Sequence, residues 1–453
     1  MAEKETGYRG KALEAIKKAR ANIGDVIRVT RENEVYEGIL IPRSEYGDEK
    51  HVVVKLKNGY NIGIAITADT KVEKVGEGME PTFAAPPLPE QKPELPRTTI
   101  ISTGGTIASR VDYRTGGVRP ALTANDLYSV VPELADVARI ETQILLSLFS
   151  ENIGSQQWTQ IAHAIAKQMS EGIEGVIVAH GTDTMGYTAA ALSFALQSLP
   201  APVIIVGSQR SADRPSSDAA TNLLGAVSAA AKAPFAEVVV AMHETPSDNY
   251  IAFHRGTKVR KCHTSRRDAF KSVNATPIAR VEENEIVMLT QDYQKRDPSR
   301  TLVLRPDFQE KVALIKFYPG MDPAIIHFYT EKEYKGIVIE GTGLGHISKA
   351  CYEGLRKAVG QGIIIAMTSQ CIWGRVNMNV YDAGRDLQAL GVIPLEDMLP
   401  ETALVKLMWV LGQTEDREEA KKLLKTNIAA EFSLRTLAEK MSCEQHKGGC
   451  DWS

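Results

Sequence analysis

The segment TTIISTGGTIAS, residues 98–109, places a β-branched apolar run directly before two consecutive glycines. The run predicts a buried strand, and the Gly pair predicts a tight turn that opens onto a helix start. Because glycine carries no Cβ, backbone N–H groups in this turn can approach a ligand closely. The hydroxyls of Thr103 and Thr106 flank the turn, so this strand end is a candidate site.

A second segment repeats the pattern, since EGVIVAHGTDTMG at 174–186 also ends an apolar run in a glycine turn. The expected strand 176–179 is followed by His180-Gly181, and then by Thr182, Asp183 and Thr184. Ligands of open parallel sheets bind outside the carboxyl ends of the strands. We therefore expect the two threonine-bearing turns to form one shared site.

From residue 98 onward, apolar strand-like runs alternate with helical patterns. The runs lie at 100–102, 144–148, 176–179, 203–206 and 238–242, with helical patterns at 159–172 and 188–199. Such alternation, with continuous apolar strands, predicts an α/β fold with a doubly wound parallel sheet. A second α/β block begins near Lys311, with strands expected at 312–318, 335–341 and 362–370 and helical stretches at 401–413 and 415–427.

The first 97 residues have a different pattern. A short basic helix is expected at 8–22, and the Val-, Ile- and Tyr-rich runs that follow it predict a small antiparallel β-barrel of about five strands. Six prolines in residues 81–97 predict a stiff, extended linker. The predicted division is a small β-barrel adaptor domain (1–80), the Pro-rich linker (81–97), a large α/β domain with the site (98–305), a smaller C-terminal α/β domain (306–428) and a tail (429–453).

Composition excludes several classes of protein. The net charge of −3 leaves no strong overall footprint for nucleic acid or membrane, and no apolar run approaches the roughly 20 residues of a membrane-spanning helix. The charged N-terminus lacks a signal-peptide core, so we expect a cytoplasmic protein without a membrane partner. The five cysteines do not indicate a disulfide framework. Cys443, His446 and Cys450 lack standard zinc spacing, so no metal site is predicted.

A threonine hydroxyl is a weak nucleophile and needs a base and a pocket that stabilises developing charge. Asp183 places a carboxylate beside Thr182, and the basic segment 254–267 supplies lysines. Lys258 or Lys261, paired to Asp183, could deprotonate a threonine, and spacing does not choose between them. The segment could instead be a solvated or anion-binding loop. The chain has no P-loop, GxSxG or HExxH motif, and GTGLGH at 341–346 lacks the rest of a dinucleotide fingerprint.

Two motifs carry a resemblance to a known family. TGGTIAS at 103–109 and HGTDTM at 180–185 resemble the two threonine signatures of bacterial-type L-asparaginases. The added barrel and linker, with the segments at 207–222, 254–270 and 403–412, resemble the D subunits of archaeal glutamyl-tRNA(Gln) amidotransferases. This resemblance implies an asparaginase-like two-domain parallel-sheet core behind the N-terminal barrel.

The resemblance also implies roles for individual residues. Thr106 would be the nucleophile with Tyr113 nearby, while Thr182, Asp183 and Lys261 would handle the proton. The family lysine lies nine residues before a phenylalanine, so the resemblance, and not the spacing alone, favours Lys261 over Lys258.

The substrate's α-carboxylate and α-amino groups would be held by Ser150, Glu151 and Asp183. The chain departs from the family at Glu151, where glutamine is usual, and at His346, which takes the place of an asparagine from the neighbouring subunit. Asp382 is the candidate for the neighbour's carboxylate. A homodimer core is implied.

The function implied is that of an ammonia-generating glutaminase subunit. It would take the amide nitrogen of glutamine or asparagine, and the complex would convert Glu-tRNA(Gln) to Gln-tRNA(Gln). An amidotransferase E subunit is the expected partner. Because this chain lacks an evident ATP site, ATP and Mg are expected at that partner, and no cofactor is expected here.

Two alternatives remain open on the sequence. One is a free-standing L-asparaginase, against which the N-terminal barrel argues. The other is a non-catalytic module that binds RNA or protein. Intact Thr106, Thr182, Asp183 and Lys261 argue against the second, because polar side chains are costly to bury without a use.

Overall fold

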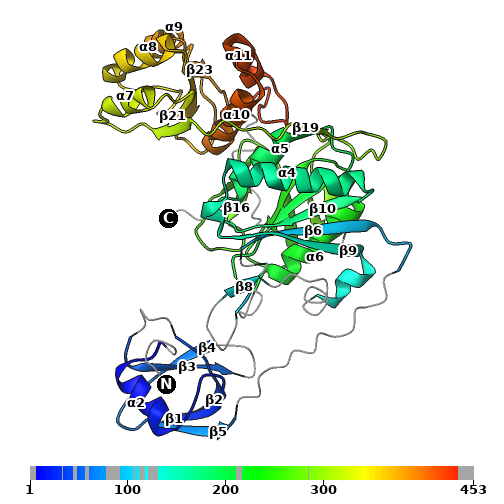
Figure 1. Ribbon diagram of the computed structural model, residues 1–453, viewed down its shortest axis with the longest axis vertical. Coiled ribbons are helices and arrows are strands. Elements are labelled where there is room, and N and C mark those ends of the chain that lie inside the picture. The colour runs from blue at the N-terminus through cyan, green and yellow to red at the C-terminus, as the bar shows by residue number, and fades with distance from the viewer. Residues whose placement is uncertain are drawn as a thin grey trace, which may run out of the picture.

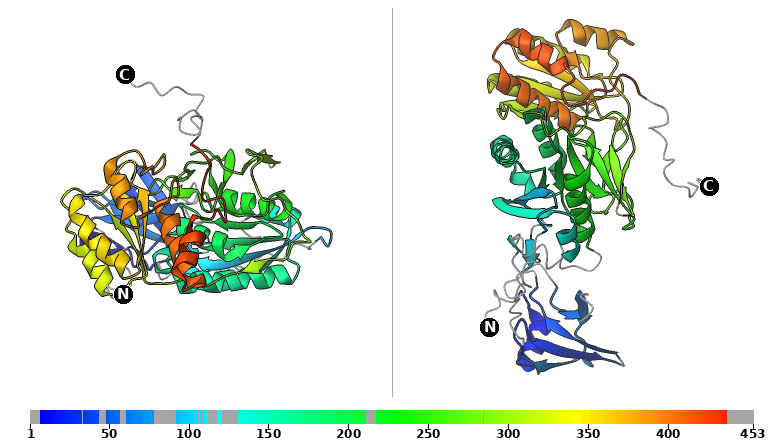
Figure 2. Two further views of the ribbon diagram at one scale, coloured as in Figure 1. Left: turned by 90° about the horizontal axis from the view of Figure 1, so that it is seen from above. Right: turned by 90° about the vertical axis from the view of Figure 1, so that its right-hand side faces the viewer.

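The computed structural model describes residues 7–32, 34–43, 48–56, 61–77, 92–105, 107, 109–111, 118–120, 131–210, 217–283 and 285–436. A small β domain, a large α/β domain and a smaller α/β domain follow one another along the long axis of the molecule (Figure 1). Two further views show the same arrangement, with the two α/β domains in direct contact (Figure 2). Among the described residues, no helix is both long enough and apolar enough to cross a membrane.

The N-terminal domain is a five-stranded antiparallel sheet with one helix packed on it. The strand order is β4-β3-β2-β1-β5, for β1 (Val26–Arg31), β2 (Glu34–Leu40), β3 (His51–Leu56), β4 (Asn61–Ala65) and β5 (Lys71–Gly76). Helix α2 (Gly10–Lys18) buries Leu13 and Ile16 in the same core as Ile27 and Val52. The Tyr8 hydroxyl donates to the Ile41 carbonyl at 2.8 Å, and its burial raises the pKa of Tyr8 to about 12. The basic helix predicted before the strands is therefore part of this core.

The large domain is built on an eight-stranded sheet of order β18-β17-β14-β13-β12-β10-β6-β9. Its parallel strands are β6 (Arg97–Gly104), β9 (Arg139–Leu148), β10 (Gly175–Ala179), β12 (Val203–Val206) and β13 (Val238–His243). All five of the strand-like runs predicted after the linker fall within these strands. The sheet continues in antiparallel fashion through β14 (Tyr250–Arg255), β17 (Ala279–Glu282) and β18 (Glu285–Met288), an extension that the sequence did not predict.

Helices cover both faces of the parallel strands. Helix α6 (Ala219–Lys232) packs on one face with Ile100 and Ile177, and α4 (Ser155–Ser170) and α5 (Met185–Ala195) pack on the other. Because neither face of the central strands β10, β12 and β13 is left to solvent, these strands are buried at every position and almost wholly apolar, whereas the edge strand β9 is partly exposed. This double coverage leaves the carboxyl edge of the sheet as the open region where a site can form.

The C-terminal domain has a four-stranded parallel sheet, of which the sequence predicted three strands, at 312–318, 335–341 and 362–370. Its strands are β20 (Val312–Lys316), β21 (Gly336–Gly341), β22 (Ile364–Ser369) and β23 (Ile393–Pro394), in that order. The helices are α7 (Ala324–Glu331), α8 (Tyr352–Gly360), α9 (Asp382–Ala389), α10 (Pro400–Gln413) and α11 (Arg417–Lys425). Trp409 of α10 stacks on Phe194 of α5 with ring centroids 5.8 Å apart, so α10 joins the two α/β domains.

Short elements complete the chain. They are the paired strands β7 (Ser109–Val111) and β8 (Val118–Pro120), β11 (Leu196–Gln197) and β19 (Val303–Leu304), and β15 (Val259–Lys261) and β16 (Phe270–Ser272). Three 3-10 turns are η2 (Pro132–Asp136), η3 (Ser150–Asn152) and η4 (Lys349–Cys351). Of these, η3 and the β15–β16 hairpin carry side chains that belong to the candidate site.

Candidate active site

The two glycine turns lie side by side, because β6 and β10 are adjacent parallel strands with Ser102 opposite Ala179. The Thr103 hydroxyl donates to the Ala179 carbonyl at 2.9 Å. A Cβ added to Gly105, whose φ is +81°, would lie 2.5 Å from the backbone nitrogen of Gly181. Only glycine fits that position, both in space and in backbone conformation. The two turns thus meet at one edge, while Thr106 and Tyr113 themselves lie outside the described residues.

Lys261 brings together the second threonine and its neighbouring carboxylate. Its Nζ lies 2.8 Å from Thr182 Oγ1 and 2.7 Å from Asp183 Oδ1. The lysine side chain is only 14% exposed, whereas Asp183 is 72% exposed. In this arrangement the ammonium group is held by a carboxylate and points at a hydroxyl oxygen, which is the geometry that proton transfer to or from that hydroxyl requires.

Lys258, the other lysine that spacing allowed, is placed elsewhere. Its Nζ lies 2.8 Å from Asp397 Oδ2, and both side chains are 1% exposed. Burial lowers the pKa of Lys258, and the charge of Asp397 acts in the opposite direction. The geometry therefore puts Lys261, and not Lys258, against the Thr182-Asp183 turn.

A buried hydrogen-bond relay supports this turn from behind. The Trp158 indole N–H donates to Thr188 Oγ1 at 3.1 Å, and that hydroxyl lies 2.9 Å from His180 Nε2. His180 Nδ1 lies 2.6 Å from the carbonyl of Gly181, one residue before Thr182. Complete burial lowers the pKa of His180 to about 4, so the ring is neutral near pH 7. No role was predicted for His180 from the sequence, although it directly precedes the Gly-Thr-Asp motif.

Ser150 and Glu151, the predicted substrate-binding pair, lie beside the same turn. The Ser150 carbonyl accepts a hydrogen bond from Thr184 Oγ1 at 2.6 Å. A Cβ added to Gly181 would lie 2.8 Å from the Ser150 Cβ, so the two backbones approach as closely as glycine allows. Ser150 is buried, whereas Glu151 is exposed on η3. Glu151 is therefore placed at the rim with its carboxylate open to solvent.

The loop after β12 also contacts the site, a contact that the sequence did not predict. A Cβ added to Gly207 would lie 2.8 Å from the His180 carbonyl and 2.9 Å from Thr182 Cγ2. Buried Asp218 accepts hydrogen bonds from the backbone N–H of Gln209 at 3.0 Å and of Arg210 at 3.0 Å. Asp218 thus anchors the segment that begins at Gly207 and closes one side of the Thr182 turn.

His346 and Asp382, the positions that the family resemblance assigns to a neighbouring subunit, lie in the C-terminal domain. The His346 ring stands edge-on to Tyr381 at 5.5 Å, and its Nε2 is buried without a partner in the described chain. Asp382 is the first residue of α9. Within the described residues, no hydrogen bond joins either side chain to Thr182, Asp183 or Lys261. The described part of the chain also contains no group of three or more acidic, His or Cys side chains placed for a metal, and Cys443, His446 and Cys450 lie outside it.

Comparison with known proteins places this site in a family. Family models match residues 21–75 (GatD N-terminal domain), 97–294 (Asparaginase, N-terminal) and 311–424 (Glutaminase/Asparaginase C-terminal domain). The glutamyl-tRNA(Gln) amidotransferase D subunit of Methanopyrus kandleri is 50% identical over 436 residues, covering 94% of each chain. The D subunit of Pyrococcus abyssi is 52% identical over 429 residues, covering 93% of this chain and 98% of its own length. The chain belongs to the family of glutamyl-tRNA(Gln) amidotransferase D subunits.

Solved structures support the same fold assignment for this D-subunit family member. The thermostable L-asparaginase from Thermococcus kodakarensis superposes with a TM-score of 0.68 at 32% identity, covering 74% of this chain and 99% of its own. L-asparaginase I from Vibrio cholerae gives a TM-score of 0.65 at 29% identity, covering 75% and 100%. The resemblance inferred from the two threonine motifs is thus confirmed, and the chain is an asparaginase-type amidotransferase subunit.

Proposed function

We propose that this chain releases ammonia from the side-chain amide of glutamine, or of asparagine, for an amidotransferase that converts Glu-tRNA(Gln) to Gln-tRNA(Gln). The observation that carries the proposal is Lys261, whose Nζ bridges Thr182 Oγ1 and Asp183 Oδ1 at 2.8 and 2.7 Å. This triad lies at the meeting point of two glycine turns in a member of the D-subunit family. A lysine held between a hydroxyl and a carboxylate is an arrangement suited to proton transfer, which favours catalysis over a binding module.

The reaction uses the two threonines in different roles. The Thr106 hydroxyl attacks the amide carbon, its proton passes to the leaving nitrogen, and the C–N bond breaks to release ammonia. Water then hydrolyses the threonyl ester and frees glutamate. Thr182, Lys261 and Asp183 handle the protons in both halves, while N–H groups of the glycine turns stabilise the oxyanion. Tyr113 stands near the nucleophile in this scheme.

Specificity for an amino-acid substrate comes from charged groups beside the turn. Ser150 lies against Gly181, exposed Glu151 follows it on η3, and Asp183 is largely exposed although it pairs with Lys261. Free carboxylate oxygens on Asp183 and Glu151 suit an α-ammonium group, and the Ser150 hydroxyl suits the α-carboxylate. The additional acid at Glu151 strengthens recognition of the ammonium end.

The synthetic half of the reaction belongs to a partner. An amidotransferase E subunit binds ATP and Mg, activates the glutamate on the tRNA and receives the ammonia, so this subunit needs no cofactor of its own. A second copy of this chain completes the pocket through the C-terminal domain that carries His346 and Asp382.

The test measures ammonia release from glutamine and asparagine, with and without the partner subunit and glutamyl-tRNA. Glutamine turnover that rises steeply only with both additions supports the proposal. Rapid asparagine hydrolysis by the chain alone overturns it in favour of a free-standing asparaginase, and the absence of any ammonia indicates a binding module.

The assignment of the nucleophile is tested separately by trapping. Thr106→Val and Thr182→Val variants are each incubated with a reactive glutamine analogue, and the covalent adduct is located by mass spectrometry. An adduct in Thr182→Val but not in Thr106→Val supports Thr106 as the acylated residue. An adduct that survives in Thr106→Val overturns the assignment.

A further inference from the structure

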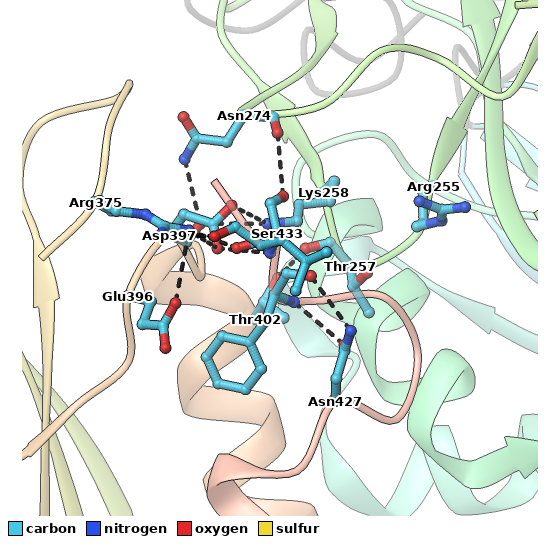
Figure 3. A network of polar contacts seen from close by, with 12 residues as sticks. Arg255, Thr257, Lys258, Asn274, Arg375, Glu396, Asp397, Thr402, Asn427 and Ser433 are labelled. Carbon is cyan, nitrogen blue, oxygen red and sulfur yellow. Dashed lines mark hydrogen bonds and ion pairs between the residues drawn. The ribbon is translucent and has the colours of Figure 1, made fainter. Parts of the chain in front are cut away.

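A buried ion pair lies only three residues from Lys261, at the junction of the two α/β domains. Lys258 Nζ contacts Asp397 Oδ2 at 2.8 Å (Figure 3). Both side chains are only 1% exposed. Lys258 immediately precedes β15 in the large domain, and Asp397 follows β23 in the C-terminal domain. The proposed reaction gives this pair no task, although removing two charges from water is costly.

Asp397 is held by three separate segments of the chain. Its Oδ1 accepts a hydrogen bond from the backbone N–H of Ser433 at 2.9 Å, and its carbonyl accepts one from Asn274 Nδ2 at 3.2 Å. Arg375 donates to the Ser433 carbonyl at 2.5 Å and lies 3.7 Å from Asp397 Oδ1. Asp397 is therefore the centre of a network that joins both α/β domains and the chain after α11 (Figure 3).

The segment after α11, residues 427–434, acts as a strap over this network. Thr257 Oγ1 donates to the carbonyl of Ala429 at 2.9 Å, and the Thr257 carbonyl accepts from Thr402 Oγ1 at 2.9 Å. A second buried pair, Lys406 with Glu431 at 2.5 Å, anchors the strap to α10. The residue before Lys258 is thus fastened to the strap and to α10 at the same time.

Strand β15 presents its two faces to different domains. Val259 packs in the core of the large domain, and Lys261, on the same face, reaches Thr182. On the other face, Arg260 Nε lies 3.1 Å from Glu401 Oε1 at the start of α10. Because side chains alternate along a strand, a slip of one residue would turn Lys261 toward the C-terminal domain.

We propose that the Lys258–Asp397 pair, closed by the strap, is a positioning device that sets the register of β15 and so aims Lys261 at Thr182. This inference rests on the proposed function of Lys261. Lys258 does not touch the reacting groups, so it acts through Lys261 alone. A buried charge pair suits the task, because it is satisfied in only one register, whereas apolar contacts tolerate small slips.

The test is a double-mutant cycle on the complete amidotransferase, using Lys258→Met, Lys261→Met and the double variant. Misplacement of a catalytic group by about 1 Å costs on the order of 100-fold in rate. We therefore expect Lys258→Met to lower kcat for ammonia release by about 10- to 100-fold, with KM changed less than twofold. In the Lys261→Met background, measured in single turnover at high enzyme concentration, Lys258→Met is expected to have no further effect.

Lys74→Met is the control, since it breaks a lysine–carboxylate pair with buried Asp25 (2.9 Å) in the N-terminal domain, away from β15 and from the strap. It is expected to lower thermal stability while leaving kcat within about twofold. If the Lys258→Met protein does not fold, the double variant Lys258→Met/Asp397→Asn, which removes both charges, takes its place in the double-mutant cycle. The same loss of kcat and the same dependence on Lys261 are expected from that double neutral variant.

Three results overturn the inference: two of them remove only the positioning role, and the third also removes the proposed function. If Lys261→Met strongly lowers the rate and Lys258→Met lowers the rate by the same further factor in both backgrounds, only the positioning role fails. A Lys258→Met enzyme with a wild-type kcat overturns it equally. If Lys261→Met keeps full activity, the proposed function fails, and the positioning role fails with it.

Discussion

Two lysine–carboxylate pairs lie three residues apart in the chain and have nearly equal lengths, yet their surroundings differ completely. Lys261 and Asp183 are 2.7 Å apart with a carboxylate that is 72% exposed, whereas Lys258 and Asp397 are 2.8 Å apart and fully enclosed. Separation alone therefore says little about what an ion pair does. Burial decides whether its members are free to exchange partners with a substrate.

The difference follows from where each pair lies in the fold. Asp183 stands at the carboxyl edge of the large sheet, where water weakens and salt screens its attraction to Lys261. Asp397 lies between two domains and beneath the strap, where a charge left without its partner has no access to water. The exposed pair is suited to chemistry and the enclosed pair to holding the backbone in place.

Replacing Lys261 is expected to have the largest effect on the rate. General acid–base groups contribute typically 10²- to 10⁴-fold, so Lys261→Met should lower ammonia release by roughly 10³-fold. The melting temperature should stay close to that of the wild type, because the partner carboxylate remains hydrated. Lys271→Met, on the adjoining strand β16, is the control and should keep its activity. If the Lys261→Met enzyme releases ammonia at the normal rate, Lys261 is not the catalytic lysine and the proposed difference in role between Lys261 and Lys258 fails.

Replacing Lys258 is expected to have the largest effect on stability. Lys258→Met leaves the buried Asp397 carboxylate with only the more distant Arg375, 3.7 Å away, as a cation, and removing one partner of a buried pair costs about 3–5 kcal/mol in the free energy of unfolding. Adding Asp397→Asn should recover part of this loss, because no unpaired charge then remains buried. Denaturant midpoints of the three proteins provide the measurement. Equal midpoints for wild type and Lys258→Met would show that this pair is not enclosed in solution.

The pH dependence of stability tests the role of His180, which supports the Thr182-Asp183 turn from behind. The pKa of His180 is about 4 in the folded chain, below its ordinary value near 6.5, because the ring is buried. As the pH falls, the histidine of the unfolded chain is protonated before that of the folded chain, which favours unfolding. His180 therefore contributes roughly 3 kcal/mol to the free energy of unfolding above pH 6.5, and this contribution is lost between pH 6.5 and 4.

We expect His180→Gln to reduce the slope of that part of the stability curve, measured as denaturant midpoints from pH 7.5 to 4.5. Part of the slope should remain, because burial also lowers the pKa of His254, to about 3. The variant removes the titrating group and keeps a polar side chain beside Thr188. An unchanged slope would mean that His180 is protonated in the native protein at these pH values.

The smallest expected effect is that of Asp183 on stability. Because its carboxylate is largely hydrated, Asp183→Asn should change the free energy of unfolding by less than about 1 kcal/mol. Asp397→Asn, the matching change in the enclosed pair, should cost clearly more. The two free energies of unfolding are measured by denaturant titration under the same conditions. Equal losses of stability from Asp183→Asn and Asp397→Asn would contradict the proposed difference between the exposed and the enclosed pair.

Much of the fold could be predicted from local pattern. The strands at 176–179 and 203–206 are apolar at every position because helices cover both faces of the sheet, and that signal is strong. Strand β17 has polar residues at alternate positions and β18 is only four residues long, so the antiparallel extension gives a weak signal and was not predicted. The anchor at Asp218 was not predicted either, because its partners in the loop are backbone N–H groups, which every sequence contains.

The candidate site also has one part that could be predicted from local sequence and another that depends on three-dimensional contacts. The threonines, glycine turns and Asp183 could be recognised from sequence, because glycine conformation and side-chain chemistry are properties of single residues and their neighbours. Thr106 and Tyr113 remain predictions, since they lie outside the described residues. The choice between Lys258 and Lys261, the relay behind His180 and the network around Asp397 required three-dimensional contacts. Lys258 is kept from the reacting groups because residue 397 meets it from the other domain, and burial is a property of the assembled chain rather than of any local segment.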